Sequence, residues 1–459
     1  MSPALRSIVL FFALVAFTPG FAAPAAAEDE TASVQESTVP AEEGTTEHRS
    51  LRCETPANPR KLHFECVGQR VDILKETLTK DWASYRTWLA NIGITHIASY
   101  TVQFMGNTSG GQRQGFTYAG TLQDLVSWDL HKILGSSGLS FNIGASYASG
   151  RNLTKEYIGN TFTVQSAYNG NGNLNLQEMF LRQQSPSGTL TVAIGRMAPA
   201  DVFATLPVFN NYINAAVNPI PGSLGLNDSS FTTSPPGVEW GALSLYNITQ
   251  TVQIAAGIYN TNPSSAAGED HGLNFAFQQG NTGILTIAQV SYLYNQAKGD
   301  VGLPGEYTIG GFYDSNDFSS LNNPSGNVNG NYGIFAMFQQ MVYRDGKPDS
   351  KKGLTLWSES AISLKQNVST VPVFVGLGLS YRGLIPRRGD DIASMAVLYG
   401  KFSEDIPQAS NEAVIETNYQ ITLTPWLLIT PDFQYIMKPS GNSNIPNAVV
   451  LGFQLVLLF

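Results

Sequence analysis

Residues 447–459, with the sequence NAVVLGFQLVLLF, restrict the folds open to this chain more than any other segment. Successive side chains of an extended strand point to opposite faces. One face of this strand therefore carries only large apolar side chains: Val449, Leu451, Phe453, Leu455, Leu457 and Phe459. The opposite face is mostly smaller and carries the one polar side chain, Gln454. We expect the apolar face to contact hydrocarbon, as in a transmembrane strand.

The composition fits neither an ordinary soluble domain nor a bundle of membrane helices. Hydrophobic residues make up 42% and charged residues 13% of the 459 residues. Soluble domains average about 25% charged residues, so this chain is unusually poor in charge. Beyond the N-terminus, no stretch approaches the roughly 20 apolar residues that a membrane-spanning helix needs.

The N-terminus predicts export. Arg6 precedes the apolar run SIVLFFALVAF, and the small residues of FAAPAAAEDE follow it. This order is typical of a secretory signal peptide, which we place at residues 1–27 with cleavage after Ala27, or alternatively near Ala22 or Ala23. A membrane anchor is the weaker interpretation because the apolar run spans only about half a bilayer.

The segment after the signal peptide is acidic. Residues 28–50 hold seven acids and one arginine, so we expect a disordered tail there. The rest of the mature chain is close to neutral, which gives no indication of a nucleic-acid partner. Cys53 and Cys66 lie close together in an exported chain and predict a disulfide. The five histidines are too far apart for metal-ligand spacing, and we expect no cofactor.

Residues 51–93 form a short N-terminal region that includes one amphipathic helix. The helix is predicted over residues 70–90, and Asn91 and Gly93 end it. Its apolar stripe consists of Val71, Leu74, Leu78, Trp82, Tyr85 and Leu89. We expect this stripe to pack against a core and the helix to lie in the periplasm.

From residue 94 onward the sequence alternates between apolar and polar residues with a period of two. Residues 371–382, VPVFVGLGLSYR, place the larger apolar side chains on one face, and residues 414–423 do the same. A soluble β-sandwich shows similar alternation. Three features favour a membrane barrel instead: strands near the 9–11 residues that cross a bilayer, aromatics at strand ends, and short turns that alternate with long loops. Only a closed barrel satisfies every main-chain group in lipid.

Loop lengths fix the number of strands. Seventeen candidate strands are odd in number, whereas bacterial single-chain barrels have an even number with both ends in the periplasm. Assigning residues 272–278, GLNFAFQ, to an external loop resolves the conflict and gives an all-β, sixteen-stranded antiparallel transmembrane barrel over residues 94–459. The predicted strands are 94–104, 115–127, 138–149, 173–184, 189–196, 237–246, 251–259, 284–295, 305–314, 331–344, 353–365, 372–382, 392–402, 414–423, 426–437 and 448–459. The third external loop, 197–236, is long enough to fold inward and narrow an aqueous channel.

Polar residues on the inner faces are the candidate substrate-channel residues. Asp432 and Gln434 alternate with aromatics, and Glu416 has the corresponding place on the preceding strand. Glu178 and Arg182 share one face of the fourth strand. Carboxylates and guanidiniums across a narrow pore supply acceptors and forked donors to a polyhydroxyl solute. The alternative is that these groups pair with one another and only stiffen the wall.

Two further candidates lie at the start of the third loop and within it. Arg196 ends the fifth strand, and we expect its guanidinium, like that of Arg182, to face the channel. In residues 195–219, Asp201 and Asn210 lie among aromatic residues, a combination that suits sugars because C–H faces stack on rings while hydroxyls bind polar groups. The alternative, which we favour for Phe203 and Phe209, is that the loop aromatics pack against the barrel.

Several segments, taken in order, resemble the OprB-type carbohydrate-selective porins of Gram-negative outer membranes. They are DWASYRTWLANIGI, LQEMFLRQ, PGEYTIGGFYDS, YRGLIPRRGDD and PDFQYIMKP. The resemblance implies a sixteen-stranded barrel and passive uptake of monosaccharides such as glucose through a charged, arginine-containing constriction. We place that constriction at Arg182 and Arg196, with Glu178 as the counter-charge. Arg387, Arg388 and Asp391 match a family motif in a predicted periplasmic turn, where a structural role is expected.

A selective sugar channel without covalent chemistry is therefore the leading function, and a general or other-solute porin is the alternative. An enzyme needs a nucleophile and a base within hydrogen-bond reach, and strand parity brings no such set together. The expected partners are small sugars, outer-membrane lipid and, through Phe459, the outer-membrane assembly machinery. A homotrimer is left open because an apolar outer face suits lipid and a subunit interface equally.

Overall fold

A computed structural model describes residues 77–168, 172–231, 238–261, 270–276, 283–296, 300–323, 325–348 and 350–459. All of them belong to one compact unit, His48–Phe459. The predicted signal peptide, the acidic tail 28–50 and the predicted Cys53–Cys66 disulfide lie outside the described residues, so these remain predictions.

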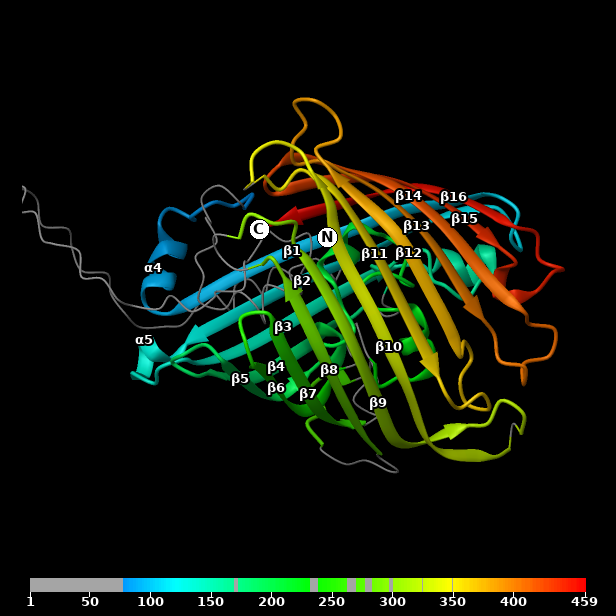
Figure 1. Ribbon diagram of the computed structural model, residues 1–459, viewed down its shortest axis with the longest axis horizontal. Coiled ribbons are helices and arrows are strands. Elements are labelled where there is room, and N and C mark those ends of the chain that lie inside the picture. The colour runs from blue at the N-terminus through cyan, green and yellow to red at the C-terminus, as the bar shows by residue number, and fades with distance from the viewer. Residues whose placement is uncertain are drawn as a thin grey trace, which may run out of the picture. The chain divides into compact units, whose positions relative to one another are not determined.

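The described part of the chain forms a closed barrel in which every strand pairs with its sequence neighbours, and β1 pairs with β16 (Figure 1). This confirms the predicted sixteen-stranded antiparallel barrel. Several strands run further than expected, and residues 272–276 lie outside any strand, as the loop count required. The strands are β1 Ile94–Ser109, β2 Gly115–Asp129, β3 Leu139–Gly150, β4 Leu174–Gln184, β5 Leu190–Met197, β6 Glu239–Asn247, β7 Val252–Thr261, β8 Gly283–Tyr294, β9 Gly305–Ser319, β10 Asn327–Arg344, β11 Gly353–Ser363, β12 Val373–Arg382, β13 Ile392–Lys401, β14 Asn411–Thr424, β15 Leu427–Met437 and β16 Ala448–Leu458.

The seam between β1 and β16 closes the barrel. The two strands pair antiparallel from Ser99 with Leu458 to Ser109 with Val449. On the inner side of the seam, Gln103 Nε2 donates to Gln454 Oε1 at 2.7 Å. The polar residue on the smaller face of the last strand thus bonds across the seam, while Leu451 and Phe453 are exposed on the outside.

The two ends of the barrel differ in the length of their links. We call the end that holds the links 185–189, 248–251 and 425–426 the turn end, and the opposite end the loop end. The longest links, 151–173 and 198–238, lie at the loop end and are called L2 and L3. β1 begins and β16 ends at the turn end, as expected for an even number of strands.

The outer surface is an apolar belt between two bands of aromatic side chains. Ile194 is 60% exposed and Leu377 is 55% exposed, both on the outside of the wall. Tyrosines are exposed near the turn end of their strands: Tyr246, Tyr292, Tyr294, Tyr307 and Tyr343. A second set is exposed nearer the loop end: Phe116, Tyr118, Tyr313, Tyr332 and Tyr399. Such paired girdles are typical of barrels that span an outer membrane.

The N-terminal helix is shorter than predicted. α4 covers only Tyr85–Asn91, and the predicted start of the helix at 70–76 lies outside the described residues. Residues Thr77–Ser84 are turns, and Lys80, Trp82, Ala83 and Ser84 have positive φ angles, which a right-handed helix does not accommodate. The helix prediction is therefore wrong for Thr77–Ser84. No described helix is long and apolar enough to cross a bilayer.

A second short helix, α5 (Leu130–Leu134), links β2 and β3 and lies with α4 at the turn end (Figure 1). The Asp129 carboxylate caps its first turn by accepting from the His131 main-chain N–H. Lys132 Nζ donates to the Ala90 carbonyl of α4 at 2.7 Å, and the Asp129 N–H donates to the Gly93 carbonyl. These contacts tie the N-terminal helix to the barrel.

The hydrophobic core lies inside the barrel, between L3 and the inner face of the wall. Its buried members on L3 include Phe203, Phe209, Tyr212 and Phe231, and its wall members include Trp357. The lumen is therefore filled in part by a folded loop, as the length of the third loop predicted.

The turn between β12 and β13 is held by one carboxylate. Arg388 Nε donates to Asp391 Oδ2 at 2.7 Å, the Tyr419 hydroxyl donates to the same oxygen at 2.8 Å, and the Thr422 N–H donates to Oδ1 at 3.0 Å. Burial favours the neutral acid, but these donors outweigh it and lower the pKa of the Asp391 carboxyl. The motif that contains Arg388 and Asp391 thus has structural contacts at the turn end.

We expect Asp391→Asn to lower the unfolding temperature at neutral pH. A carboxyl whose pKa is lowered by folding stabilises the fold above its unfolded pKa of about 3.9, and that stabilisation is lost as the pH falls through the folded pKa. The difference between wild type and variant should therefore shrink below about pH 4. Heat-induced loss of barrel mobility on gels, measured across pH, tests this. Asp390→Asn, at an exposed neighbouring position, is the matched control and should show no such pattern.

Candidate functional site

L3 crosses the lumen as a series of short helical turns. These are η2 (Pro199–Asp201), η3 (Pro207–Asn211) and α6 (Gly222–Asn227). The Phe203 ring meets Tyr259 of β7 edge-on with centroids 6.4 Å apart, and the Phe231 ring meets Phe312 of β9 at 4.7 Å. The aromatics of L3 therefore pack against the wall, which confirms the alternative favoured for Phe203.

Trp357 on β11 is the central wall contact of L3. Its indole ring lies edge-on to Phe209 at 5.3 Å and to Tyr212 at 5.1 Å. Trp357 Nε1 donates to the Tyr212 hydroxyl at 2.8 Å, and that hydroxyl donates to the Leu379 carbonyl at 2.7 Å. The indole fits because Gly378 faces it: a Cβ at that position would lie 2.4 Å from the ring. Phe209 thus also packs on the wall.

The opposite flank of L3 is held by Glu416 on the inner face of β14. Its Oε1 accepts from the Ile213 main-chain N–H at 2.6 Å, and its Oε2 accepts from the Asn214 N–H at 3.2 Å. Asn418 on the same strand face donates to Glu416 and to the Asn211 carbonyl, at 3.1 and 3.0 Å. Glu416 points inward as predicted, and its oxygens bind the main chain of L3.

Asp432 and Gln434 on β15 also point inward. Gln434 Oε1 accepts from Asn214 Nδ2 at 2.9 Å, and Gln434 Nε2 donates to the Val164 carbonyl at 3.0 Å and to Asp432 Oδ2 at 2.9 Å. The amide of Gln434 therefore joins L2 and L3 to the wall. Both side chains are buried.

Glu412 on β14 anchors L2 in the same way that Glu416 anchors L3. Its carboxylate accepts from the main-chain N–H groups of Thr161 and Phe162, both at 2.8 Å, and from that of Ser440. Glu412 was not predicted from the sequence, although it shares the strand face of Glu416. L2 and L3 also bond directly, from the Ser166 N–H to the Ile213 carbonyl and from the Ala215 N–H to the Thr163 carbonyl. The two loops form one inward-folded unit.

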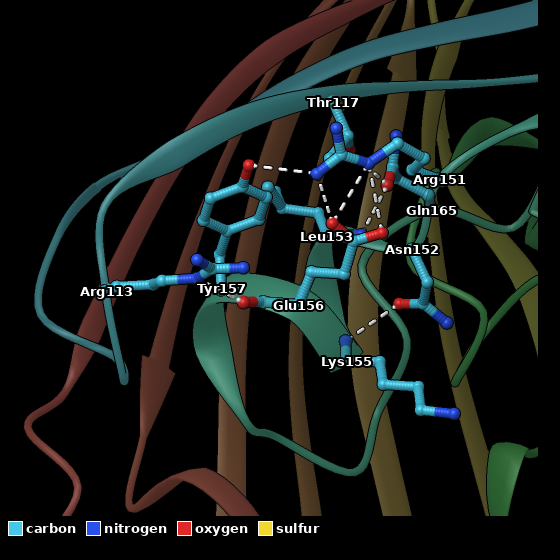
Figure 2. A network of polar contacts seen from close by, with 9 residues as sticks. All are labelled: Arg113, Thr117, Arg151, Asn152, Leu153, Lys155, Glu156, Tyr157 and Gln165. Carbon is cyan, nitrogen blue, oxygen red and sulfur yellow. Dashed lines mark hydrogen bonds and ion pairs between the residues drawn. The ribbon is translucent and has the colours of Figure 1, made fainter.

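The base of L2 is fixed to the β1–β2 turn by a polar network at the loop end (Figure 2). The Arg151 guanidinium forms an ion pair with Glu156, which lowers the pKa of that carboxyl, and it donates to the Tyr157 hydroxyl at 3.1 Å. Arg113 Nε donates to the Glu156 carbonyl at 2.8 Å, and its guanidinium lies over the Tyr157 ring at 4.6 Å. On β2 beside the network, Thr117 Oγ1 donates to Gln165 Oε1 at 3.1 Å. L2 is thus held both by Glu412 of β14 and by the β1–β2 turn.

Glu178 and Arg182 lie on the inner face of β4, because Leu181 and Gln183 between and beside them are exposed on the outside. Glu178 faces Gly144 of β3, where a Cβ would lie 3.1 Å from Oε1. Arg182 pairs with Ser140 and Ala193 across its two neighbouring strands. Both side chains therefore point inward, four residues apart along the same strand.

Arg196 lies on the other side of the wall. In β5 the exposed residues Leu190, Val192 and Ile194 mark the outer face, and Arg196 continues their alternation. Its side chain is buried because residues 270–276 cover it: Arg196 Nη1 donates to the Gly272 carbonyl, and its guanidinium lies 5.6 Å from the Phe275 ring. The barrel wall therefore separates this guanidinium from the lumen, contrary to the placement expected from the sequence.

The segment 270–276 covers Arg196 because β5 is short. β5 pairs with β4 only from Met179 to Gln184, which leaves the loop end of β4 without that neighbour. The Leu176 N–H instead donates to the His271 carbonyl at 2.9 Å, and His271 Nδ1 lies 2.8 Å from the Leu174 carbonyl. β5 ends early since the chain turns inward there to form L3. The same turn that fills the lumen thus creates the outer site of Arg196.

The remaining predicted residues lie on L3 itself. Asp201 is in η2 and Asn210 is in η3, and both are half-buried. They lie on other elements than Glu178 and Arg182 of β4. Among the described residues, no three His, Cys, Asp or Glu side chains converge on a metal-binding point.

Comparison with known proteins decides the family. The profile described as "Carbohydrate-selective porin, OprB family" matches residues 113–459. The chain belongs to this family. The protein is therefore a carbohydrate-selective porin of the outer membrane, and its family and fold point to a transport channel rather than an enzyme. The turn end accordingly faces the periplasm.

Individual relatives agree over most of their length. The chain is 24% identical to Porin B of Pseudomonas aeruginosa over 424 residues, which cover 83% of this chain and 90% of that protein. It is 25% identical to the putative porin QuiX of Acinetobacter baylyi, over 84% of this chain and 93% of that protein. The high-pH structure of Pseudomonas putida OprB superposes with a TM-score of 0.77 at 23% identity, covering 85% of this chain and 100% of that one. This last likeness shows the shared barrel fold.

We expect Glu416→Ala to raise single-channel conductance in planar bilayers. Without the carboxylate, the N–H groups of Ile213 and Asn214 lose their acceptor, so L3 leaves its position across the lumen. Unpairing buried donors should also lower the free energy of unfolding by about 1–3 kcal/mol. Thr417→Ala, the exposed outer-face neighbour, is the control and should change neither quantity. Wild-type conductance in Glu416→Ala would contradict the anchoring role.

Proposed function

We propose that this porin takes up monosaccharides such as glucose by passive diffusion, and that Glu178 and Arg182 form the polar part of its constriction. The observation that carries the proposal is the placement of both side chains on the inner face of β4, in a lumen that L2 and L3 narrow. No covalent step is involved.

The chemistry of the pair suits a sugar. A guanidinium presents several N–H donors in a fixed plane, and a carboxylate presents only acceptors, so together they match the alternating donor and acceptor hydroxyls of a sugar ring. Two periods of strand alternation separate the two residues, with the buried Phe180 between them on the same face.

The other predicted channel residues contribute differently to the proposal. Glu416, Asp432 and Gln434 act through the loops, because their contacts hold L2 and L3 in the lumen. Asp201 and Asn210 lie on the loop so held, and they are proposed as secondary contacts for the solute. Arg196 is left out, since the wall separates it from the lumen.

The test compares two arginine variants in planar bilayers. Wild-type protein should conduct ions, and glucose should reduce the current in a concentration-dependent manner. In Arg182→Ala the half-blocking glucose concentration should rise about tenfold, because hydrogen bonds to a charged group contribute about 1.5 kcal/mol or more. Arg196→Ala should block like wild type.

Each result has a distinct meaning. Equal effects of Arg182→Ala and Arg196→Ala would show that the constriction is placed wrongly. Conductance without glucose block would indicate the alternative, a general or other-solute porin. Absence of any pore would overturn the channel itself. Liposome swelling with sugars of different size and with epimers then identifies the preferred solute.

We further propose how the protein reaches its membrane. Residues 1–27 direct export in a Gram-negative bacterium, and Phe459 at the end of β16 is read by the outer-membrane assembly machinery. The support is the apolar outer face of β16 and the pairing of the Phe459 N–H with the Ala98 carbonyl at the seam. Loss of assembly on deletion of Phe459 is the expected result.

A further inference from the structure

The aromatic band at the turn end is interrupted at β1. Other strands carry exposed tyrosines there, such as Tyr246, Tyr292 and Tyr307. The corresponding outer position of β1 carries His96 instead, and Asp124 lies on the outer face of β2, four residues before the outward-facing Trp128. Their outward direction follows from unbroken alternation with Phe104 and Tyr118, which pair across β1 and β2 and lie on the outer face.

A carboxylate on the lipid-facing side of a barrel is unfavourable unless it is covered. His96 and Asp124 are each 8% exposed, so something covers them. His96 Nε2 lies 3.0 Å from Asp124 Oδ1, and the His96 ring lies 5.3 Å from the ring of Trp82. The Arg86 guanidinium lies in turn 4.4 Å from the Trp82 ring. The segment before β1 therefore lies over this polar pair.

The same segment is fastened to the seam of the barrel. Arg86 Nη2 donates to the main-chain oxygen of Phe459 at 2.6 Å, and Nη1 donates to Thr77 Oγ1 at 2.9 Å. The Leu78 N–H donates to the Leu458 carbonyl at 2.8 Å. These bonds join the end of β16 to the start of the segment, so its position over β1 and β2 is fixed on two sides.

The surface that the segment turns away from the barrel is aromatic. Trp88 is 49% exposed and Tyr85 is 41% exposed, and their rings stack with centroids 5.3 Å apart. Trp82 and Leu78 are also partly exposed. Tryptophan and tyrosine are the residues enriched where a membrane meets water, because one part of each ring is apolar and another binds water.

We propose that residues Thr77–Asn91 complete the aromatic girdle at the seam, and that Trp88, Tyr85 and Trp82 contact phospholipid of the periplasmic leaflet. The segment supplies the aromatic side chains that β1 lacks at this level and shields the His96–Asp124 pair from lipid. Its surface continues the lipid-facing belt of the barrel, which is why a phospholipid is the occupant and not a soluble partner. This inference rests on the outer-membrane location and is independent of the solute that the channel selects.

The test measures where Trp88 lies, using full-length protein in phosphatidylcholine vesicles. The emission of Trp88 is taken as the difference between wild type and Trp88→Phe. Bromine placed near the carbonyl end of the acyl chains should quench this component, and aqueous iodide on both sides should not. Quenching by iodide without quenching by bromolipid would overturn the proposal and would place the helix in the periplasm.

The control uses a tryptophan of known surroundings. Trp357 lies inside the barrel against Phe209 and Tyr212 and is 2% exposed. Its component, obtained from Trp357→Phe, should resist both quenchers. Glucose block in Trp88→Phe should equal that of wild type, which separates failure of this inference from failure of the proposed solute.

A second experiment tests the shielding. We expect Arg86→Ala to lower the unfolding temperature of the barrel in detergent, because Asp124 and the Phe459 main-chain oxygen lose a cationic neighbour. Arg86→Ala combined with Asp124→Asn should recover part of that loss, since the uncompensated charge is then removed. Lys80→Ala, at an exposed position of the same segment, is the matched control. An unchanged unfolding temperature in Arg86→Ala would contradict the shielding role.

Discussion

Closure of the main-chain hydrogen bonds between β1 and β16 is the contact on which the rest of this structure depends. A sheet in hydrocarbon cannot leave an open edge, because each unpaired N–H or C=O costs several kcal/mol there. Once the seam is closed, alternation assigns every wall residue to lipid or to the lumen. The same closure sets the width of the lumen, and a lumen of this width needs loops to narrow it.

The inward loops must satisfy their own main chain and bury their own apolar groups. L3 meets these two demands with different groups: aromatics such as Phe209 pack on Trp357, while Glu416 accepts the main-chain N–H groups of Ile213 and Asn214. In L2, Glu412 accepts main-chain N–H groups in the same way. The lumen is therefore shaped by a folded insert with a hydrophobic side and a polar side, and Glu178 and Arg182 lie on the wall beside it.

Much of this architecture was predictable from the sequence, because a period of two is a strong local signal. The sixteen strands, the inward direction of Glu416, Asp432 and Gln434, and the packing role of Phe203 and Phe209 followed from alternation and loop length. Arg196 also follows the outward alternation of Ile194. It was nevertheless assigned to the lumen, because a charged residue at the end of an apolar strand was not expected on the outer face. The residues that cover it there, Gly272 and Phe275, are distant in sequence and could not be foreseen. The anchoring by Glu412 and Glu416 was hidden because their partners are main-chain groups, which carry no sequence signal.

That anchoring has an evolutionary consequence. Since Glu412 and Glu416 bind main-chain amide protons of residues 161, 162, 213 and 214, these anchoring bonds do not depend on the side chains there, and proline alone removes the donor. Exposed side chains elsewhere on the loops can therefore change, and with them the groups that meet a solute, while the anchoring bonds are kept. A porin built in this way can change the solutes that it binds while it keeps its barrel and the anchors of its loops.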